Sequence, residues 1–259
     1  MNYKLDILMV LVSFSLFTSC EKVDPTPNTS NESLPTGQLK FHLHTFIGEN
    51  EVDAYGIEMT MPDGRMISID MAQLYISEIQ LVKLDGSVYN VPSKGVLKVF
   101  ESESVTLGNV PVGNYKSVRF KVGLPASTNA LAPTTEGYTA LLNQPEMWLS
   151  SIMQPDGYAF LNFRGSIDTT AAKTGTKVPY EYKIGTNANL VEVEMLQQKF
   201  SIYKDEVGYV HMKIAYDRLF EGITLSNNAF LHITSVADNS LPIVETLKQN
   251  IAKMFIYEN

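Results

Sequence analysis

The stretch LKFHLHTF, residues 39–46, carries the pattern on which the fold assignment depends. Apolar and polar side chains alternate along it, so a β-strand would place Phe41 and Leu43 on one face and His42 and His44 on the other. This period of two predicts a half-buried strand at the start of the folded part of the chain.

Runs of the same kind continue along the sequence. Turn residues bound several of them, as in PDG at residues 62–64 and DGS at residues 85–87. The further strands are expected at 66–70, 74–84, 96–100, 104–110, 116–122, 158–167, 191–202, 207–216 and 230–234. Many short strands without long helices between them predict an all-β fold, an antiparallel β-sandwich of immunoglobulin-like or Greek-key type.

A short C-terminal helix completes the expected fold. Ser240 can cap it, and Pro242 suits its first turn. One apolar stripe follows, which we expect to pack on the core, at Ile243, Leu247, Ile251, Met254 and Phe255. A second, shorter helix is expected at residues 136–143, and an exposed loop at residues 169–179.

The N-terminal residues have the features of a secretory signal. Lys4 precedes an apolar run that is too short to span a membrane, and small residues then lead directly into Cys20, as in a bacterial lipobox. We therefore expect residues 1–19 to be a lipoprotein signal peptide, cleaved so that Cys20 carries lipid. An ordinary signal peptide with an incidental cysteine is the alternative.

Residues 20–38 are expected to form a lipidated flexible tether, because they are rich in Pro, Ser, Thr and Asn and have few side chains that could join a core. Residues 39–259 then form the folded domain. The protein is expected to be extracytoplasmic and anchored to a bacterial membrane by its lipid, at the outer membrane or cell surface.

Composition excludes several classes of function. The 259 residues carry a formal net charge of −8, which argues against a nucleic-acid partner because phosphate binding needs basic groups. The single cysteine excludes a disulfide framework, a cysteine-based zinc site and an iron–sulfur cluster. The sequence holds no H-E-x-x-H, G-x-S-x-G, phosphate-binding loop or dinucleotide-binding fingerprint, and we expect no enzymatic activity. The only support for a hydrolase function would be acidic residues to which no other role is assigned.

The histidines are the remaining candidates for chemistry. His42 and His44 share a strand face at i and i+2, roughly 6.5–7 Å apart, so they could bind one ion or simply contact solvent. His211 is expected to be solvated, because neighbouring Lys213 would disfavour a bound cation. His232 is expected to be half-buried with one hydrogen bond. The acidic pairs 101/103 and 192/194 are interpreted as solvated strand edges.

Several motifs occur in an order that points to a known family. They are QLYISEIQLV at residues 73–82, VPVGNY at 110–115, FKVG at 120–123, GYAFLNFRG at 157–165 and YKIG at 182–185, together with Asn129, Trp148, His232, Asn250 and Phe255. They resemble the segments "Y-I-S-N-I-x-L", "I-P-x-G-x-Y", "F-x-I-G", "G-Y-x-F-x-x-x-x-G" and "Y-H-I-G" of the methanobactin-operon copper-binding (MbnP-like) family. The resemblance covers residues 39–257.

The resemblance implies a β-sandwich that binds copper through histidines and a tryptophan. In relatives that tryptophan is oxidised to kynurenine, a step assigned to a di-haem peroxidase-like partner. Carried over to this chain, the implied metal residues are His42, His44, His232 and Trp148.

The chain departs from the family pattern at two positions. The histidine of "Y-H-I-G" is Lys183 here, and the second tryptophan of a "W-x-W" is Ser150. Copper binding needs convergent neutral donors, so a lysine at a ligand position disfavours a bound copper ion. A metal-free cell-surface binding or adhesion module on the same scaffold, with Trp148 and Tyr158 forming an apolar recognition surface, is the alternative function.

Overall fold

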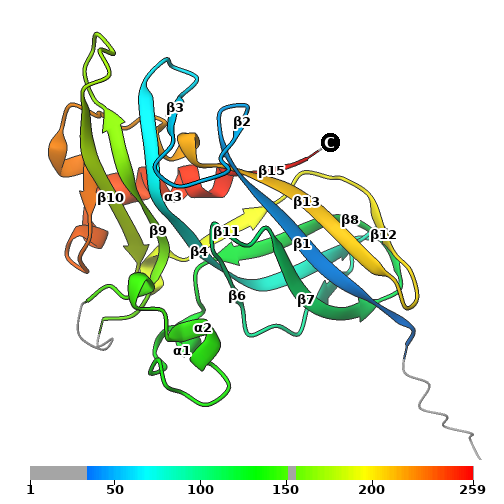
Figure 1. The fold of residues 1–259 in the computed structure, drawn as a ribbon. Helices are drawn as coiled ribbons and strands as arrows, with labels where there is room; N and C mark the ends of the chain where they lie inside the picture. The colour runs from blue at the N-terminus through cyan, green and yellow to red at the C-terminus, as the bar shows by residue number, and fades with distance from the viewer. Residues whose placement is uncertain (1–33, 151–155, 259) are drawn as a thin grey trace, which may run out of the picture. The chain divides into compact units, whose positions relative to one another are not determined.

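Two β-sheets make up the described part of the chain, residues 34–150 and 156–258, in a computed structural model (Figure 1). The predicted signal peptide, Cys20 and most of the predicted tether lie outside the described residues. Strand β1 begins at Thr36, three residues before the strand predicted from the alternating pattern. No helix in the described ranges is both long and apolar enough to cross a membrane.

The first sheet, sheet A, is organised around β1. Its strands are β1 (Thr36–Ile47), β2 (Asn50–Glu51), β7 (Ser104–Pro111), β13 (Val207–Ala215) and β15 (Phe255–Tyr257). Strand β13 lies along one edge of β1 and pairs with it in parallel, whereas β7 and β2 pair with β1 in antiparallel fashion. The alternation predicted for β1 is confirmed, because Phe41 and Leu43 are buried while His42 and His44 lie on the outer face.

The second sheet, sheet B, is built on one long strand, β4 (Met66–Lys83). Its main path runs β11-β8-β4-β9-β10-β14, and short strands β3, β5, β6 and β12 pair at its sides. The bounds are β3 (Glu58–Thr60), β5 (Val88–Asn90), β6 (Val96–Lys98), β8 (Gly113–Val122), β9 (Ala159–Asp168), β10 (Lys177–Gly185), β11 (Val191–Glu194), β12 (Phe200–Ile202) and β14 (His232–Ile233).

The two sheets pack through their apolar faces. Phe41 of sheet A and Phe120 of sheet B lie 6.0 Å apart between ring centroids, and Phe255 of β15 meets Phe120 at 4.9 Å. Buried residues of both sheets belong to one continuous core. The predicted all-β sandwich is therefore confirmed, with two parallel pairs, β1–β13 and β10–β14, inside a mostly antiparallel arrangement.

Within the described residues three α-helices accompany the sheets: α1 (Ala126–Asn129), α2 (Thr139–Leu142) and α3 (Pro242–Lys253). The predicted C-terminal helix is α3, which buries Val244, Leu247 and Ile251 against the core. The predicted cap at Ser240 is wrong, because Leu241 occupies the cap position and supplies no side-chain hydrogen bond. The proline at the first helical position compensates in part, since it has no amide hydrogen to satisfy.

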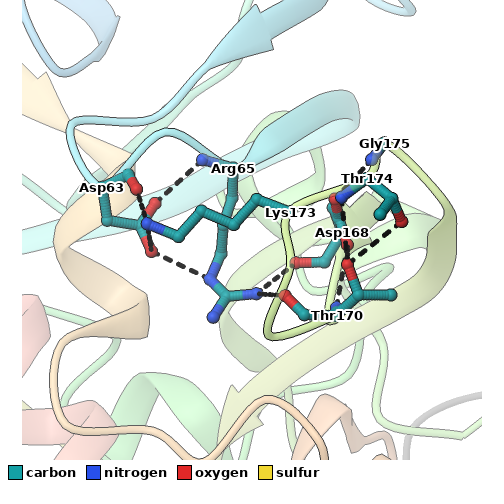
Figure 2. A network of polar contacts seen from close by, with 7 residues as sticks. All are labelled: Asp63, Arg65, Asp168, Thr170, Lys173, Thr174 and Gly175. Carbon is teal, nitrogen blue, oxygen red and sulfur yellow. Dashed lines mark hydrogen bonds and ion pairs between the residues drawn. The ribbon is translucent and has the colours of Figure 1, made fainter.

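The loop after β9 is fastened to the rest of sheet B by a polar network centred on Asp168 (Figure 2). Its carboxylate accepts hydrogen bonds from the amide and hydroxyl of Thr170 and from the amide of Gly175. These hydrogen bonds lower the pKa of Asp168 below its ordinary value, and the bond from the Thr170 hydroxyl has the largest effect. Arg65 donates to the carbonyls of Asp168 and Thr170, which fastens the start of this loop, and the loop predicted at 169–179 is shorter because β10 begins at Lys177.

A buried cation lies under the turn between β6 and β7. Lys98 is only 1% exposed, and its Nζ donates to the carbonyls of Val99 and Phe100. Burial lowers the pKa of Lys98 from an ordinary 10.5 to about 8, and nearby Glu103 and Glu101 oppose the shift. The folded protein therefore holds this proton less tightly than the unfolded chain does.

This shift predicts how Lys98 affects stability as the pH changes. Between about pH 8 and pH 10.5 the unfolded chain binds more protons at this residue, so the folded state gains stability as the pH rises. Compared with a Lys98→Met variant, the wild-type protein should gain about 2 kcal/mol between roughly pH 7 and pH 9.5. Urea unfolding of both proteins at the two pH values measures this gain. A difference in free energy of unfolding between wild type and Lys98→Met that does not change with pH would contradict the prediction.

Candidate metal centre

Two imidazoles lie together on the outer face of β1. The alternation of the strand turns His42 and His44 to the same side, and their ring centroids are 4.3 Å apart. Nε2 of His44 lies 3.0 Å from Nδ1 of His42. Metal–nitrogen bonds of about 2.0–2.1 Å place two nitrogens on one ion roughly 2.9–3.4 Å apart, so this pair has the spacing of neighbouring ligands.

A third imidazole comes from the neighbouring strand. In the parallel pairing of β1 with β13, His42 lies directly opposite His211. Nδ1 of His211 lies 3.1 Å from Nδ1 of His42. The sequence prediction for His211 is therefore half right: the side chain is exposed, but it contacts another histidine. Lys213 pairs with His44 across the two strands, and its Nζ lies over the Phe46 ring, 4.4 Å from the centroid, and 3.9 Å from Glu49.

Carboxylates surround the outer nitrogens of the first two imidazoles. Glu103, which precedes β7, lies 3.5 Å from Nε2 of His42, and its carbonyl accepts from the amide of Leu43. Glu51 of β2 lies 2.7 Å from Nδ1 of His44, and Glu258 lies 3.9 Å from the same atom. The interpretation of Glu103 as a solvated edge residue misses this role.

The donor atoms fit a metal ion. One ligand atom each from His42, His44 and Glu103 lie within 4.8 Å of one another. Burial, together with repulsion from His44 and His211, lowers the pKa of His42 below its ordinary value of 6.5, so this imidazole is neutral at pH 7. Neutral imidazole is the form that binds metal, and the three nearby carboxylates favour a cation.

Of the other two residues implied by the resemblance, His232 lies on sheet B and Trp148 lies outside the strands of both sheets. His232 begins β14 and pairs with Glu181 of β10, while Trp148 bridges to Tyr158. Neither makes a hydrogen bond or ring contact with His42 or His44 within the described ranges. The prediction that the four residues form one site is not supported by such a contact, and it stays a prediction.

Trp148 is held by the chain around it. Its indole N–H donates to the carbonyl of Leu142 at 3.1 Å. Its own carbonyl accepts from Nζ of Lys183 at 3.4 Å. The lysine that replaces the family histidine therefore places its ammonium group beside the tryptophan.

Sequence reasoning missed His211 and Glu103 as members of the histidine cluster. The pairing that brings His211 to His42 joins residues 169 positions apart in the chain. Parallel pairing at this distance leaves no local pattern, so the only sequence signal was the shared outward face of His211, Tyr209 and Lys213. Glu103 is positioned by its backbone bond to Leu43, which is equally non-local.

Comparison with known proteins places this chain in a family. The family model described as MbnP matches residues 36–238. A solved structure, MbnP from Methylosinus trichosporium, is similar to this chain at 13% sequence identity, with a TM-score of 0.48, over 73% of this chain and 78% of that chain. No curated protein matches. Because the family model spans most of the sequence, as the motifs predicted, this chain belongs to the MbnP family.

Proposed function

We propose that this chain is a lipid-anchored, extracytoplasmic protein that binds copper through the histidine cluster of sheet A. The observation that carries the proposal is the approach of His44 Nε2 to His42 Nδ1 at 3.0 Å, with Glu103 in the same compact group of potential ligands. The anchor rests on the lipobox-like residues that end at Cys20. A di-haem peroxidase-like partner, which would oxidise Trp148, belongs to the same proposal.

Copper is favoured over other ions by the donor chemistry. Imidazole suits copper, zinc and nickel, whereas sites for magnesium, calcium and manganese are built from oxygen donors. Membership of the MbnP family favours copper within that group. The nearby carboxylates Glu51, Glu103 and Glu258 add negative charge, which raises the local concentration of any cation.

A calorimetric titration of Cu(II) into the purified protein tests the proposal. We expect one equivalent to bind with a dissociation constant at or below roughly micromolar. A His42→Ala/His44→Ala double variant should bind at least about 100-fold more weakly, because it loses two ligands, and loss of a mere outer partner already costs 10–100-fold. Binding no tighter than roughly millimolar, or binding that the double variant leaves unchanged, refutes the proposal.

His232→Ala is the matched control for the same titration. It removes an imidazole from sheet B and leaves the cluster on sheet A intact. Unchanged copper affinity in this variant assigns the ion to sheet A alone. A loss equal to that of the double variant would instead support the four-residue site that the resemblance implies.

One observation favours a second function, a metal-free binding module, but the recognition surface predicted from Trp148 and Tyr158 is wrong because Tyr158 is fully buried. Lys183 donates to the carbonyl of Trp148, so a cation stands beside the residue that the resemblance assigns to copper. If the protein has lost its metal, neither wild type nor Lys183→His should bind copper in the titration above. Tight binding by the wild-type protein excludes this function.

A further inference from the structure

The histidine cluster admits two coordination sets that differ in chemistry. His42, His44 and Glu103 form a two-histidine, one-carboxylate set, the kind of triad that holds iron(II) in oxygenases. His42, His44 and His211 form an all-imidazole set, which suits copper and zinc, although His211 lies outside the group of donor atoms that are all within 4.8 Å of one another. The two sets share His42 and His44 and differ in their third member, and because His211 lies at Nδ1 of His42 and Glu103 at its Nε2, the surroundings of that ring discriminate between them.

Nδ1 of His42 faces two imidazole nitrogens at once. His44 Nε2 is 3.0 Å away and His211 Nδ1 is 3.1 Å away. A neutral ring nitrogen has either one hydrogen or one lone pair, so a single hydrogen bond satisfies only one of these neighbours. A cation bound to His42 Nδ1 accepts its lone pair in place of either hydrogen bond, and both neighbouring nitrogens lie close enough to His42 to share that ion once the exposed His211 side chain turns toward it.

The opposite nitrogens face carboxylates. Nε2 of His42 lies 3.5 Å from Glu103, and Nδ1 of His44 lies 2.7 Å from Glu51. An imidazole that binds metal through one nitrogen donates its other N–H to a carboxylate in most metal sites, which fixes the ring and its tautomer. The Glu51 carboxylate favours a proton on Nδ1 of His44, although their contact lacks hydrogen-bond geometry, and a proton there leaves the Nε2 lone pair available to a metal.

We infer, on the basis of the proposed function, that the ion is bound by three imidazole nitrogens: His42 Nδ1, His44 Nε2 and His211 Nδ1. Glu51 and Glu103 are then positioning residues outside the ligand set. His211 can adjust to the ion, because its side chain is exposed and its only side-chain hydrogen bond within the described ranges is to His42. The site therefore selects copper and zinc over iron(II) and manganese.

Pulsed electron paramagnetic resonance of the Cu(II)-loaded full chain tests the ligand assignment, because it counts coordinated imidazoles. We expect three in the wild-type protein, two in His211→Ala and three in Glu103→Gln. Chelator-competition titrations with Cu(II) and Zn(II) should show at least about a tenfold weaker affinity for His211→Ala. Since His211 is exposed, the variant should keep its fold, and circular dichroism of the unloaded protein checks that it does.

The positioning role of Glu51 is tested by the Cu(II) affinity of two variants. Glu51→Ala should weaken Cu(II) binding by about 10–100-fold, and Glu51→Gln should restore most of it, because an amide oxygen still accepts the His44 N–H. Failure of this rescue contradicts the positioning role.

The inference is overturned if His211→Ala keeps the wild-type affinity and imidazole count while Glu103→Gln loses the ion. That result would assign the two-histidine, one-carboxylate set. A different result refutes the proposed function itself: the wild-type protein binds no copper, or its copper affinity is unchanged when His42 and His44 are replaced.

Discussion

A Gly165→Ala protein is expected to lose at least about 3 kcal/mol of its free energy of unfolding, a large part of the roughly 5–15 kcal/mol by which an ordinary folded protein is stable. A Cβ atom at this position would lie 2.0 Å from the backbone carbonyl oxygen of Ser68 and 2.8 Å from the Tyr180 hydroxyl. Gly165 lies in β9 between β4 and β10, so neither neighbour can move without breaking pairing.

The close approach serves a buried hydrogen bond. The hydroxyl of Tyr180 donates to the carbonyl of Ser68 at 3.2 Å, and the absent side chain at residue 165 leaves room for the tyrosine to reach it. Gly208→Ala is the matched control, because its new Cβ would meet chiefly the flexible end of Ile202. Urea unfolding should show a loss within about 1 kcal/mol for Gly208→Ala, and an equal loss in both variants would contradict the argument.

Much of the sandwich could be predicted because its signals are local. Alternation places the core face of β1 correctly, and the apolar stripe near the C-terminus identifies α3. The last glycine of the family-like motif at 157–165 is the residue just discussed, so one motif marks a position where the backbone leaves no room for a side chain.

The strand boundaries in sheet B were harder to predict. Two strands were expected at 66–70 and 74–84, but β4 runs through both. A register shift lies between Ser77 and Gln80, and Glu78 within it has a φ of 47°. The family segment has asparagine there, which tolerates this backbone conformation better than most residues. A single strand predicted at 191–202 is instead β11 and β12, which pair with different parts of β8.

The candidate site was predictable only where it lies within one strand. His42 and His44 share a face because of their spacing, and this needs no tertiary information. His211 and Glu103 join them through strand pairing, and the assignment of His232 and Trp148 came from the resemblance rather than from local pattern. The register of β13 against β1 is the fact that the sequence alone does not contain.

Copper is expected to stabilise the folded protein by an amount set by its affinity. An ion that binds the folded state and not the unfolded chain adds RT ln(1 + [L]/Kd), about 2.7 kcal/mol when free metal is 100 times the dissociation constant. The unfolded chain keeps the adjacent pair His42 and His44, but it cannot present His211 or Glu103 beside them. Most of the free energy of copper binding should therefore appear as an increase in the free energy of unfolding.

Urea unfolding with and without Cu(II), at a free-metal concentration held by a chelator buffer, measures this gain. The wild-type protein should gain about 2–3 kcal/mol at 100 times its measured dissociation constant. His44→Ala should gain almost nothing at the same free-metal concentration, because it lacks the ligand that Glu51 orients. His232→Ala should gain as much as the wild type. A similar gain in His44→Ala would place the stabilising ion elsewhere on the protein, since a folded cluster without His44 cannot supply it.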